Sequence, residues 1–310
     1  MARRRRMEMV MDRLIRLAVS IGVFLCIGSN VFAVAGPIPP IVESAALKNV
    51  SVDDITAACD RQGGVVFFGE LHDSTQAHAA ELALLESLYR RYGERTVLSM
   101  EMFERDTQDT VNDFLSGRTD ETAFLVKSRP WPNYESAYRP LIMFAKEKGI
   151  PVVAANIPRR MAAAYAHGTA LDGLDAADKL YLPRIHREGS AAYREKFTMT
   201  MKGMTAGAMV VPEERIEPMF RAQCLKDDAM AESISDYAAA HKDALIFHVQ
   251  GAFHSEEGLG VPEKLRVLRP QLKTIIVDSI EYKADDGDIV SFAEEHRQDG
   301  DYLVFVSRDK

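Results

Sequence analysis

The sequence lacks the features that define several protein classes. Among its 310 residues are three cysteines and one tryptophan, and its apolar runs fall short of the ~20 residues that span a bilayer. With 47% hydrophobic and 27% charged residues, the composition excludes a disordered chain, a collagen-like repeat and a polytopic membrane protein. No linker rich in proline, glycine or serine divides residues 36–310, which favours a single domain there.

Positive charge is scarce outside the N-terminus. The formal net charge is −8, but residues 1–35 hold six arginines against Glu8 and Asp12, so residues 36–310 carry −12. An acidic protein of this kind is poorly suited to neutralising phosphates, and we therefore expect no nucleic-acid partner.

Residues 1–35 are typical of a signal peptide. The basic cluster Arg3–Arg6 precedes an apolar stretch from Leu14 to Leu25, and Ala33–Ala35 form a small-x-small cleavage site. We expect export to the periplasm, possible membrane association included. Two alternatives are an uncleaved N-terminal membrane anchor and a lipoprotein modified at Cys26, although bulky residues precede that cysteine.

Two cysteines remain after cleavage, Cys59 and Cys224. In an oxidising compartment they could form a disulfide, but a single distant pair does not define a disulfide framework. Two separate buried thiols are the alternative.

Short apolar runs alternate with helical patterns along the rest of the chain. Helices are predicted over Thr75–Tyr92, capped by Asp73 or Ser74 and ended by Gly93, and over Tyr138–Lys148. Strands are predicted at Val65–Gly69, Thr96–Glu101, Val152–Asn156, Leu245–Gln250, Thr274–Asp278 and Tyr302–Ser307. This alternation predicts an α/β fold, an open and mostly parallel sheet covered by helices on both faces.

A methionine-rich segment interrupts this alternation. Residues 170–215 contain a helical stretch followed by Tyr193–Pro212, and a long helix is predicted over Arg215–His241. We interpret the segment as a helical insertion or lid. Its methionines could bind Cu(I) or simply form a flexible apolar surface; they are Met199, Met201, Met204 and Met209.

Two strands are followed by the same Gly-x-x-His motif. Gly69–His72 follows the first predicted strand, and Gly251–His254 follows the fourth. Ligands of open α/β sheets bind beyond the carboxyl ends of the strands, and glycine there permits close backbone approach. His72 and His254 are therefore expected to face one pocket.

Carboxylates accompany these histidines. Glu70 lies within the first motif, Glu101 ends the second strand and Glu104 follows it. As acid–base groups we consider Glu70, His72, Glu101 and His254, and as ligands of a divalent metal His72, Glu101, Glu104 and His254. The alternative is a structural ion pair, for example between Glu101 and Arg159.

Common catalytic motifs are absent from the chain. It contains no H-E-x-x-H, no G-x-x-x-x-G-K-[ST], no G-x-G-x-x-G after a strand and no G-x-S-x-G. Their absence argues by motif against a zinc protease of that type, a nucleotide-binding enzyme and a serine hydrolase.

Aromatic and arginine residues suggest a second kind of ligand. Tyr134, Tyr138 and Arg139 follow the only tryptophan, Trp131, and Arg159 follows the third strand. A flat apolar surface, an oxygen ligand and cations for propionates are what a haem site uses. Ordinary packing and surface salt bridges are the alternative roles.

Taken in order, these segments resemble the ChaN family, haem-binding uptake proteins of the Tiki superfamily. The resemblance spans about residues 50–270. It rests on Gly69–Asp73, Glu101–Arg105, Tyr138–Leu141, Asn156–Arg159, Ala222–Gln223, Asp228–Ala231, Gly251–His254 and Gly260–Pro262.

The resemblance implies an exported α/β protein that binds haem as a homodimer, with a tyrosine-type ligand. It also implies a role in haem or iron uptake, with an outer-membrane receptor as a possible partner. The wider superfamily includes metal-dependent proteases and esterases, in which the positions of Glu70, His72, Glu101 and His254 look catalytic or metal-binding. We therefore expect a periplasmic haem-binding protein, with a metal-dependent hydrolase as the alternative and a catalytically inert scaffold for protein contacts as a third.

Overall fold

The structure is a computed structural model that describes residues 37–204, 211–283 and 286–307. The described residues all belong to one compact unit. The predicted signal peptide, its cleavage site and Cys26 lie outside them, so the division at residue 35 stays a prediction.

Eight strands form one sheet in the order β2-β1-β8-β7-β3-β6-β4-β5. The strands are β1 (Ile41–Glu43), β2 (Lys48–Val50), β3 (Gly64–Glu70), β4 (Thr96–Glu104), β5 (Val152–Asn156), β6 (Leu245–Gly251), β7 (Thr274–Glu281) and β8 (Tyr302–Val306). All pairs among β3 to β8 are parallel, whereas β1 pairs antiparallel with both β2 and β8. The six predicted strands are confirmed, and the short β1–β2 pair is an element that the sequence analysis missed.

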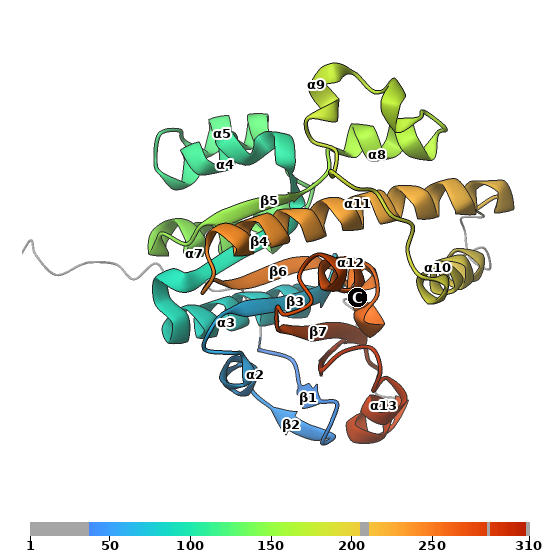
Figure 1. Cartoon of the computed structure of the whole chain (residues 1–310). Helices are drawn as coiled ribbons and strands as arrows, with labels where there is room; N and C mark the ends of the chain where they lie inside the picture. The colour runs from blue at the N-terminus through green and yellow to red at the C-terminus, as the bar shows by residue number, and fades with distance from the viewer. Residues whose placement is uncertain (1–36, 205–210, 284–285, 308–310) are drawn as a thin grey trace, which may run out of the picture. The chain divides into compact units, whose positions relative to one another are not determined.

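Helices cover both faces of this sheet (Figure 1). They are α2 (Val52–Ala58), α3 (Thr75–Tyr92), α4 (Gln108–Leu115), α5 (Glu121–Ser128), α6 (Tyr134–Ala137), α7 (Arg139–Lys148), α8 (Arg159–Ala166), α9 (Ala176–Lys179), α10 (Ala191–Met204), α11 (Glu213–Ala240), α12 (Val261–Leu268) and α13 (Ile289–Glu295). One face of β3 packs against α3 and α7, and the opposite face packs against α11 and α12. The predicted α/β class is thereby confirmed.

Strand β3 shows why burial on both faces follows from the sequence. All seven of its residues are buried, with Val66 and Phe68 in the core under α3 and Val65 and Phe67 in the core under α11. A strand between two helical layers needs apolar side chains on each side, which explains a continuous rather than alternating apolar run.

Helix α3 begins and ends where its capping residues predict. The Ser74 hydroxyl accepts a hydrogen bond from the Ala77 N–H at 3.2 Å, and Gly93 ends the helix with φ +57°. The second predicted helix begins at Arg139 instead of Tyr138, which is its N-cap. The long predicted helix is α11, which runs from Glu213 to Ala240.

The predicted insertion contains α9 and α10. Helix α10 carries Met199, Met201 and Met204, whereas Met209 lies outside the described residues. None of the helices described here is both long and apolar enough to cross a bilayer.

Candidate functional site

The order of the strands brings the two Gly-x-x-His motifs together. Strand β6 lies between β3 and β4, so that Glu70 at the end of β3 is opposite Gly251 at the end of β6. A cavity of about 860 Å³ opens beyond these carboxyl ends. Its walls include Glu70, His72, Glu101, Trp131, Gly251 and His254. The cavity therefore forms where the strand topology of an α/β sheet predicts a ligand site.

Glu70 belongs to a polar cluster on the α3 face of the sheet. Its Oε1 lies 2.6 Å from His72 Nδ1 and accepts a hydrogen bond from the Tyr138 hydroxyl at 2.7 Å. Its Oε2 lies 3.5 Å from Nδ1 of His78, a residue of α3 whose Nδ1 is also 3.1 Å from Glu81 Oε2. We call Glu70, His78 and Glu81 the floor cluster.

The floor cluster is buried and rich in carboxylates. Burial, together with the neighbouring Glu81 carboxylate, raises the pKa of Glu70 to about 8, and burial raises the pKa of Glu81 to about 7. A carboxyl group that still holds its proton near neutral pH can act as a general acid in the cavity. The hydroxyl of Tyr138 is held in place as a donor to Glu70, and burial raises the pKa of this tyrosine.

A second cluster lies on the α11 face of the sheet. His254 Nε2 lies 3.2 Å from Glu101 Oε1, and His254 Nδ1 lies 2.5 Å from Oδ1 of Asp227, a residue of α11. The other oxygen of Glu101 accepts a hydrogen bond from the Gly251 N–H at 2.9 Å. All three side chains are buried. We call Glu101, His254 and Asp227 the charged triad.

The charged triad holds His254 as a cation. Although burial opposes the charged ring, its two carboxylate neighbours raise the pKa of His254 to about 9. The same interaction outweighs the burial of Glu101 and holds the pKa of that carboxyl well below its usual range. Because both ring nitrogens face carboxylates, neither has a free lone pair for a metal or a substrate proton.

His72 lies between the two clusters at the edge of the sheet. A Cβ atom added at Gly251 would lie 2.9 Å from the His72 ring, so any larger residue at this strand end would displace the ring from its present position. The ring meets Trp131 edge to face with centroids 4.8 Å apart, and 42% of the side chain is exposed. Burial of the ring is outweighed by its bond to Glu70, which raises the pKa of His72. His72 is thus the histidine of the pair that a ligand can reach.

Several predicted site residues lie away from this cavity. Glu104 is buried at the end of β4, where Arg129 and Arg159 donate to it at 2.7 and 2.9 Å. Arg139 donates two hydrogen bonds to Glu121 at 2.6 and 2.9 Å. The alternative pairing of Glu101 with Arg159 is wrong, because Arg159 donates to Glu104 whereas Glu101 pairs with His254.

The tyrosines predicted for haem are also enclosed. Tyr134 is 4% exposed and Tyr138 is fully buried, and neither lines the cavity. Haem ligation by Tyr134 or Tyr138, and propionate binding by Arg139 or Arg159, stay predictions that require these side chains to leave their present partners.

The insertion contributes an apolar wall. Phe197 and Met201 of α10 line the cavity together with Phe253, whereas Met199, two residues away on the same helix, is 66% exposed. Lys226 of α11 lines the same cavity and supplies a cation. The combination of apolar walls and a few polar groups is typical of sites for small molecules and cofactors.

The structure separates the two cysteines. Cys59 and Cys224 are both free and buried, so the disulfide alternative is not what the structure contains. Burial raises the pKa of Cys59 to about 11 and that of Cys224 to about 12, which keeps both in the unreactive thiol form.

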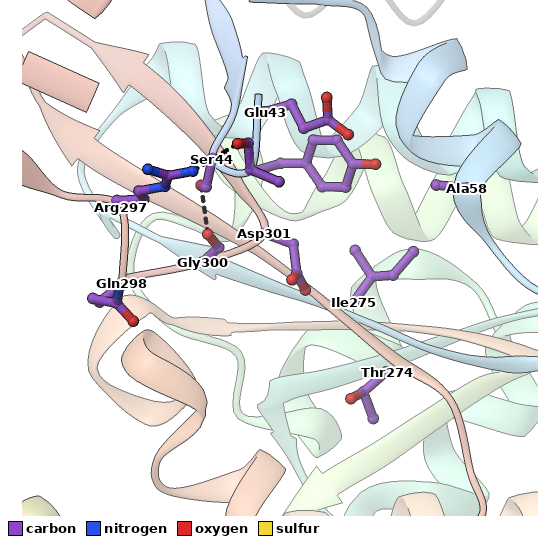
Figure 2. A pocket seen from close by; sticks show the side chains of 11 residues that line it. Glu43, Ser44, Ala58, Thr274, Ile275, Arg297, Gln298, Gly300 and Asp301 are labelled. Atoms are coloured by element: carbon purple, nitrogen blue, oxygen red, sulfur yellow. Dashed lines mark hydrogen bonds between the residues drawn. The ribbon is translucent and has the colours of Figure 1, made fainter. Parts of the chain in front are cut away.

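A second cavity lies at the amino ends of the strands, opposite the carboxyl ends where the first cavity opens (Figure 2). It measures about 400 Å³ and lies beside Thr274 and Tyr302, the first residues of β7 and β8. Its polar groups mainly serve the local backbone: the Ser44 hydroxyl donates to the Gly300 carbonyl at 2.6 Å, and Asp301 accepts from the Ile276 N–H. The cavity at the carboxyl ends, which gathers perturbed titratable groups, is the better candidate for function.

The fold and the site together define an α/β protein in which a Gly-x-x-His motif lies at the end of each of two parallel strands. Polar side chains gather beyond the carboxyl ends of these strands. The chain belongs to the family described as haem-binding uptake, Tiki superfamily, ChaN, whose model matches residues 59–265. No curated protein matches the chain.

A solved structure shows the same fold. The structure of cofacial haem binding to ChaN of Campylobacter jejuni is similar, with a TM-score of 0.65 and 14% identity over 87% of this chain and 97% of that one. Weaker likenesses are a mutant of the erythromycin esterase EreC (TM-score 0.43, 12% identity, 78% and 76% of the two chains) and a type III effector (0.45, 12%, 84% and 94%). At 14% identity, the likeness to the Campylobacter structure concerns the fold alone.

Proposed function

We propose that this protein binds haem in the periplasm and acts in haem or iron uptake. The observation that carries the proposal is membership of the haem-binding uptake family across most of the chain. The basic and apolar N-terminal segment supports export. Cofacial binding, as described for the Campylobacter protein, places two haems face to face, which supports a homodimer here. An outer-membrane haem or iron receptor is a candidate partner in this role.

The cavity beyond β3, β4 and β6 fits a haem better than the predicted arginine positions do. Trp131, Phe197, Met201 and Phe253 would contact the porphyrin, and Lys226 would pair with a propionate. Arg139 and Arg159 already bind Glu121 and Glu104. When bound, the haem would supply the iron that an uptake protein carries.

Titration with haemin tests this proposal, and two variants of one helix locate the site. The wild-type protein is expected to give a saturable Soret shift near one haemin per chain. Met201→Glu places a carboxylate in the apolar wall, and burying that charge against the porphyrin should cost at least about 1.4 kcal/mol of binding free energy. We therefore expect haemin affinity to fall at least about tenfold. Met199→Glu, on the exposed side of α10, is the matched control and should leave affinity unchanged.

No saturable Soret shift in the wild-type protein would remove the haem proposal. Equal affinity of Met201→Glu and wild type, with loss in an Arg159→Ala variant, would instead move the haem to the arginine positions predicted from the sequence.

A hydrolase is the second candidate, and one observation favours it. Glu70 and His72 form a hydrogen-bonded pair at the cavity with the pKa of each raised, as acid–base pairs require. In this function Glu70 would exchange a proton with the substrate or water and His72 would stabilise charge. The metal set predicted from the sequence does not fit, because Glu104 is bonded to arginines and both nitrogens of His254 face carboxylates.

Hydrolysis of ester and peptide substrates tests this candidate. We expect turnover by the wild-type protein and a loss of at least about 100-fold in Glu70→Gln, the range that a general acid–base group contributes. Arg139→Gln, a change outside the cavity, should leave the rate unchanged. Equal hydrolysis by wild type and Glu70→Gln would show that the activity is not that of this pair.

A further inference from the structure

The floor cluster has the composition of a metal site that lies below the motifs themselves. Glu70 comes from the end of β3, and His78 and Glu81 come from the first turns of α3. Spaced three residues apart, His78 and Glu81 share one face of the helix, the face turned to the sheet. One ligand atom from each of the three lies within 4.8 Å of the others, and all three side chains are buried.

The ring of His78 is held in the orientation that metal-binding histidines adopt. Its Nε2 lies 3.0 Å from the carbonyl oxygen of His72. Since a carbonyl only accepts hydrogen bonds, Nε2 carries a hydrogen, and the lone pair of the neutral ring is on Nδ1. That Nδ1 faces Glu81 and Glu70 at 3.1 and 3.5 Å. A backbone anchor on one nitrogen and carboxylates before the other is the arrangement found around bound metals.

The two carboxylates leave oxygen atoms without donors. Among the described residues no N–H or O–H group bonds to Glu70 Oε2 or Glu81 Oε1, although both atoms are buried. By contrast, Glu70 Oε1 is fixed by the Tyr138 hydroxyl at 2.7 Å and by His72 at 2.6 Å. Tyr138 therefore orients the carboxylate and leaves Oε2 turned to the cluster. Two buried carboxylates require either a shared proton or a cation.

We propose that Glu70, His78 and Glu81 bind one divalent first-row transition ion, Mn²⁺, Fe²⁺ or Zn²⁺. One imidazole nitrogen with two carboxylates suits such ions and does not suit Cu(I), which prefers sulfur ligands. Of the three residues Glu70 lines the cavity, so we place the route by which the ion and its water ligands would enter on that side. This ion would lie next to the Glu70–His72 pair, and the proposal does not rest on haem binding.

A second acidic group serves as an internal comparison. Glu256, Asp278 and Asp299 also approach one another within 4.8 Å. Here a lysine is already present, because Lys196 lies 2.8 Å from Glu256. The floor cluster has no lysine or arginine partner among the described residues, which is why we assign the metal to it.

Calorimetric titration of the chelator-treated protein with MnCl₂ tests the proposal, with the electron paramagnetic resonance spectrum of Mn²⁺ as a second readout. We expect about one ion per chain, displaced by Zn²⁺. Glu81→Gln keeps the shape of the side chain but removes a proposed ligand, and should weaken Mn²⁺ binding by more than about 100-fold. Loss of a residue that only hydrogen-bonds to a ligand weakens metal binding by roughly 10- to 100-fold. Tyr138→Phe removes only the orienting hydroxyl and should fall within that smaller range.

Asp299→Asn, in the comparison group, is the matched control and should bind Mn²⁺ as the wild type does. Circular dichroism of each variant establishes that it is folded. Absence of saturable Mn²⁺ and Zn²⁺ binding by the wild-type protein overturns the proposal, as does equal affinity of wild type and a folded Glu81→Gln. Because haemin binding is measured separately, the haem and metal proposals can fail independently.

Discussion

Replacement of His254 by glutamine is expected to destabilise the protein by about 3–5 kcal/mol, the effect of removing one partner from a buried ion pair. The imidazolium lies between Glu101 and Asp227, which are both buried. Glutamine retains hydrogen-bonding capacity but no charge, so the two carboxylates would face each other without a cation. Urea unfolding followed by circular dichroism measures the free energy of unfolding of both proteins.

The pH dependence of stability gives a second signature of the same residue. The pKa of His254 is raised from 6.5 to about 9. Its stabilisation is therefore complete below pH 6.5 and is lost as the pH rises toward 9. We expect the wild type to lose stability across this window and the difference between wild type and His254→Gln to shrink with it.

Two variants separate the charge effect from general damage. His296→Gln removes a half-buried histidine whose single carboxylate partner is Asp299, and about 1 kcal/mol or less is expected. Adding Asp227→Asn to His254→Gln removes the surplus negative charge and should recover part of the lost stability. If His254→Gln were no more destabilising than His296→Gln, the triad would not be the buried ionic network described here.

The site residues near the strand ends could be predicted from the sequence, whereas the order of the strands could not. Glu70, His72, Glu101 and His254 could be found from the sequence because each lies within three residues of the carboxyl end of an apolar strand, where polar side chains reach ligands. All four line one cavity. The sequence could not reveal that β6 inserts between β3 and β4, since strand order depends on tertiary packing. The position of β6 between β3 and β4 brings His254 close to Glu101.

Helical members of the site were missed. His78, Glu81 and Asp227 lie within long helices whose apolar spacing dominates the pattern. A signal was present in α3, because His78 and Glu81 fall on the same buried face as apolar residues and a buried charge needs a partner. For a related reason, the sequence could not show which partners the arginines predicted to bind propionates have in the fold. Arg139 and Arg159 bind carboxylates that are 18 and 55 residues away in sequence, and such partners cannot be seen without the fold.

Gly69→Ala is the second substitution for which we expect a large effect. A Cβ atom at this position would lie 2.5 Å from Asp278 Oδ1 and 2.8 Å from the Cα atom of Ala252. The second contact is with backbone, so relief requires movement of the turn that follows β6 and carries His254. Overpacking of this kind destabilises by about 1–3 kcal/mol, and we expect the upper end of that range.

Haemin affinity should fall together with stability in Gly69→Ala, since the turn displaced by the new methyl group carries Phe253 and His254, two walls of the cavity. Gly173→Ala is the matched control: only Thr169 comes near the added atom, at 3.8 Å, and a change within about 0.5 kcal/mol is expected. Unfolding free energies and haemin titrations of the two variants check both expectations. Loss of stability with unchanged haemin affinity would place the haem away from this turn, whereas unchanged stability would contradict the close packing of β3 against it.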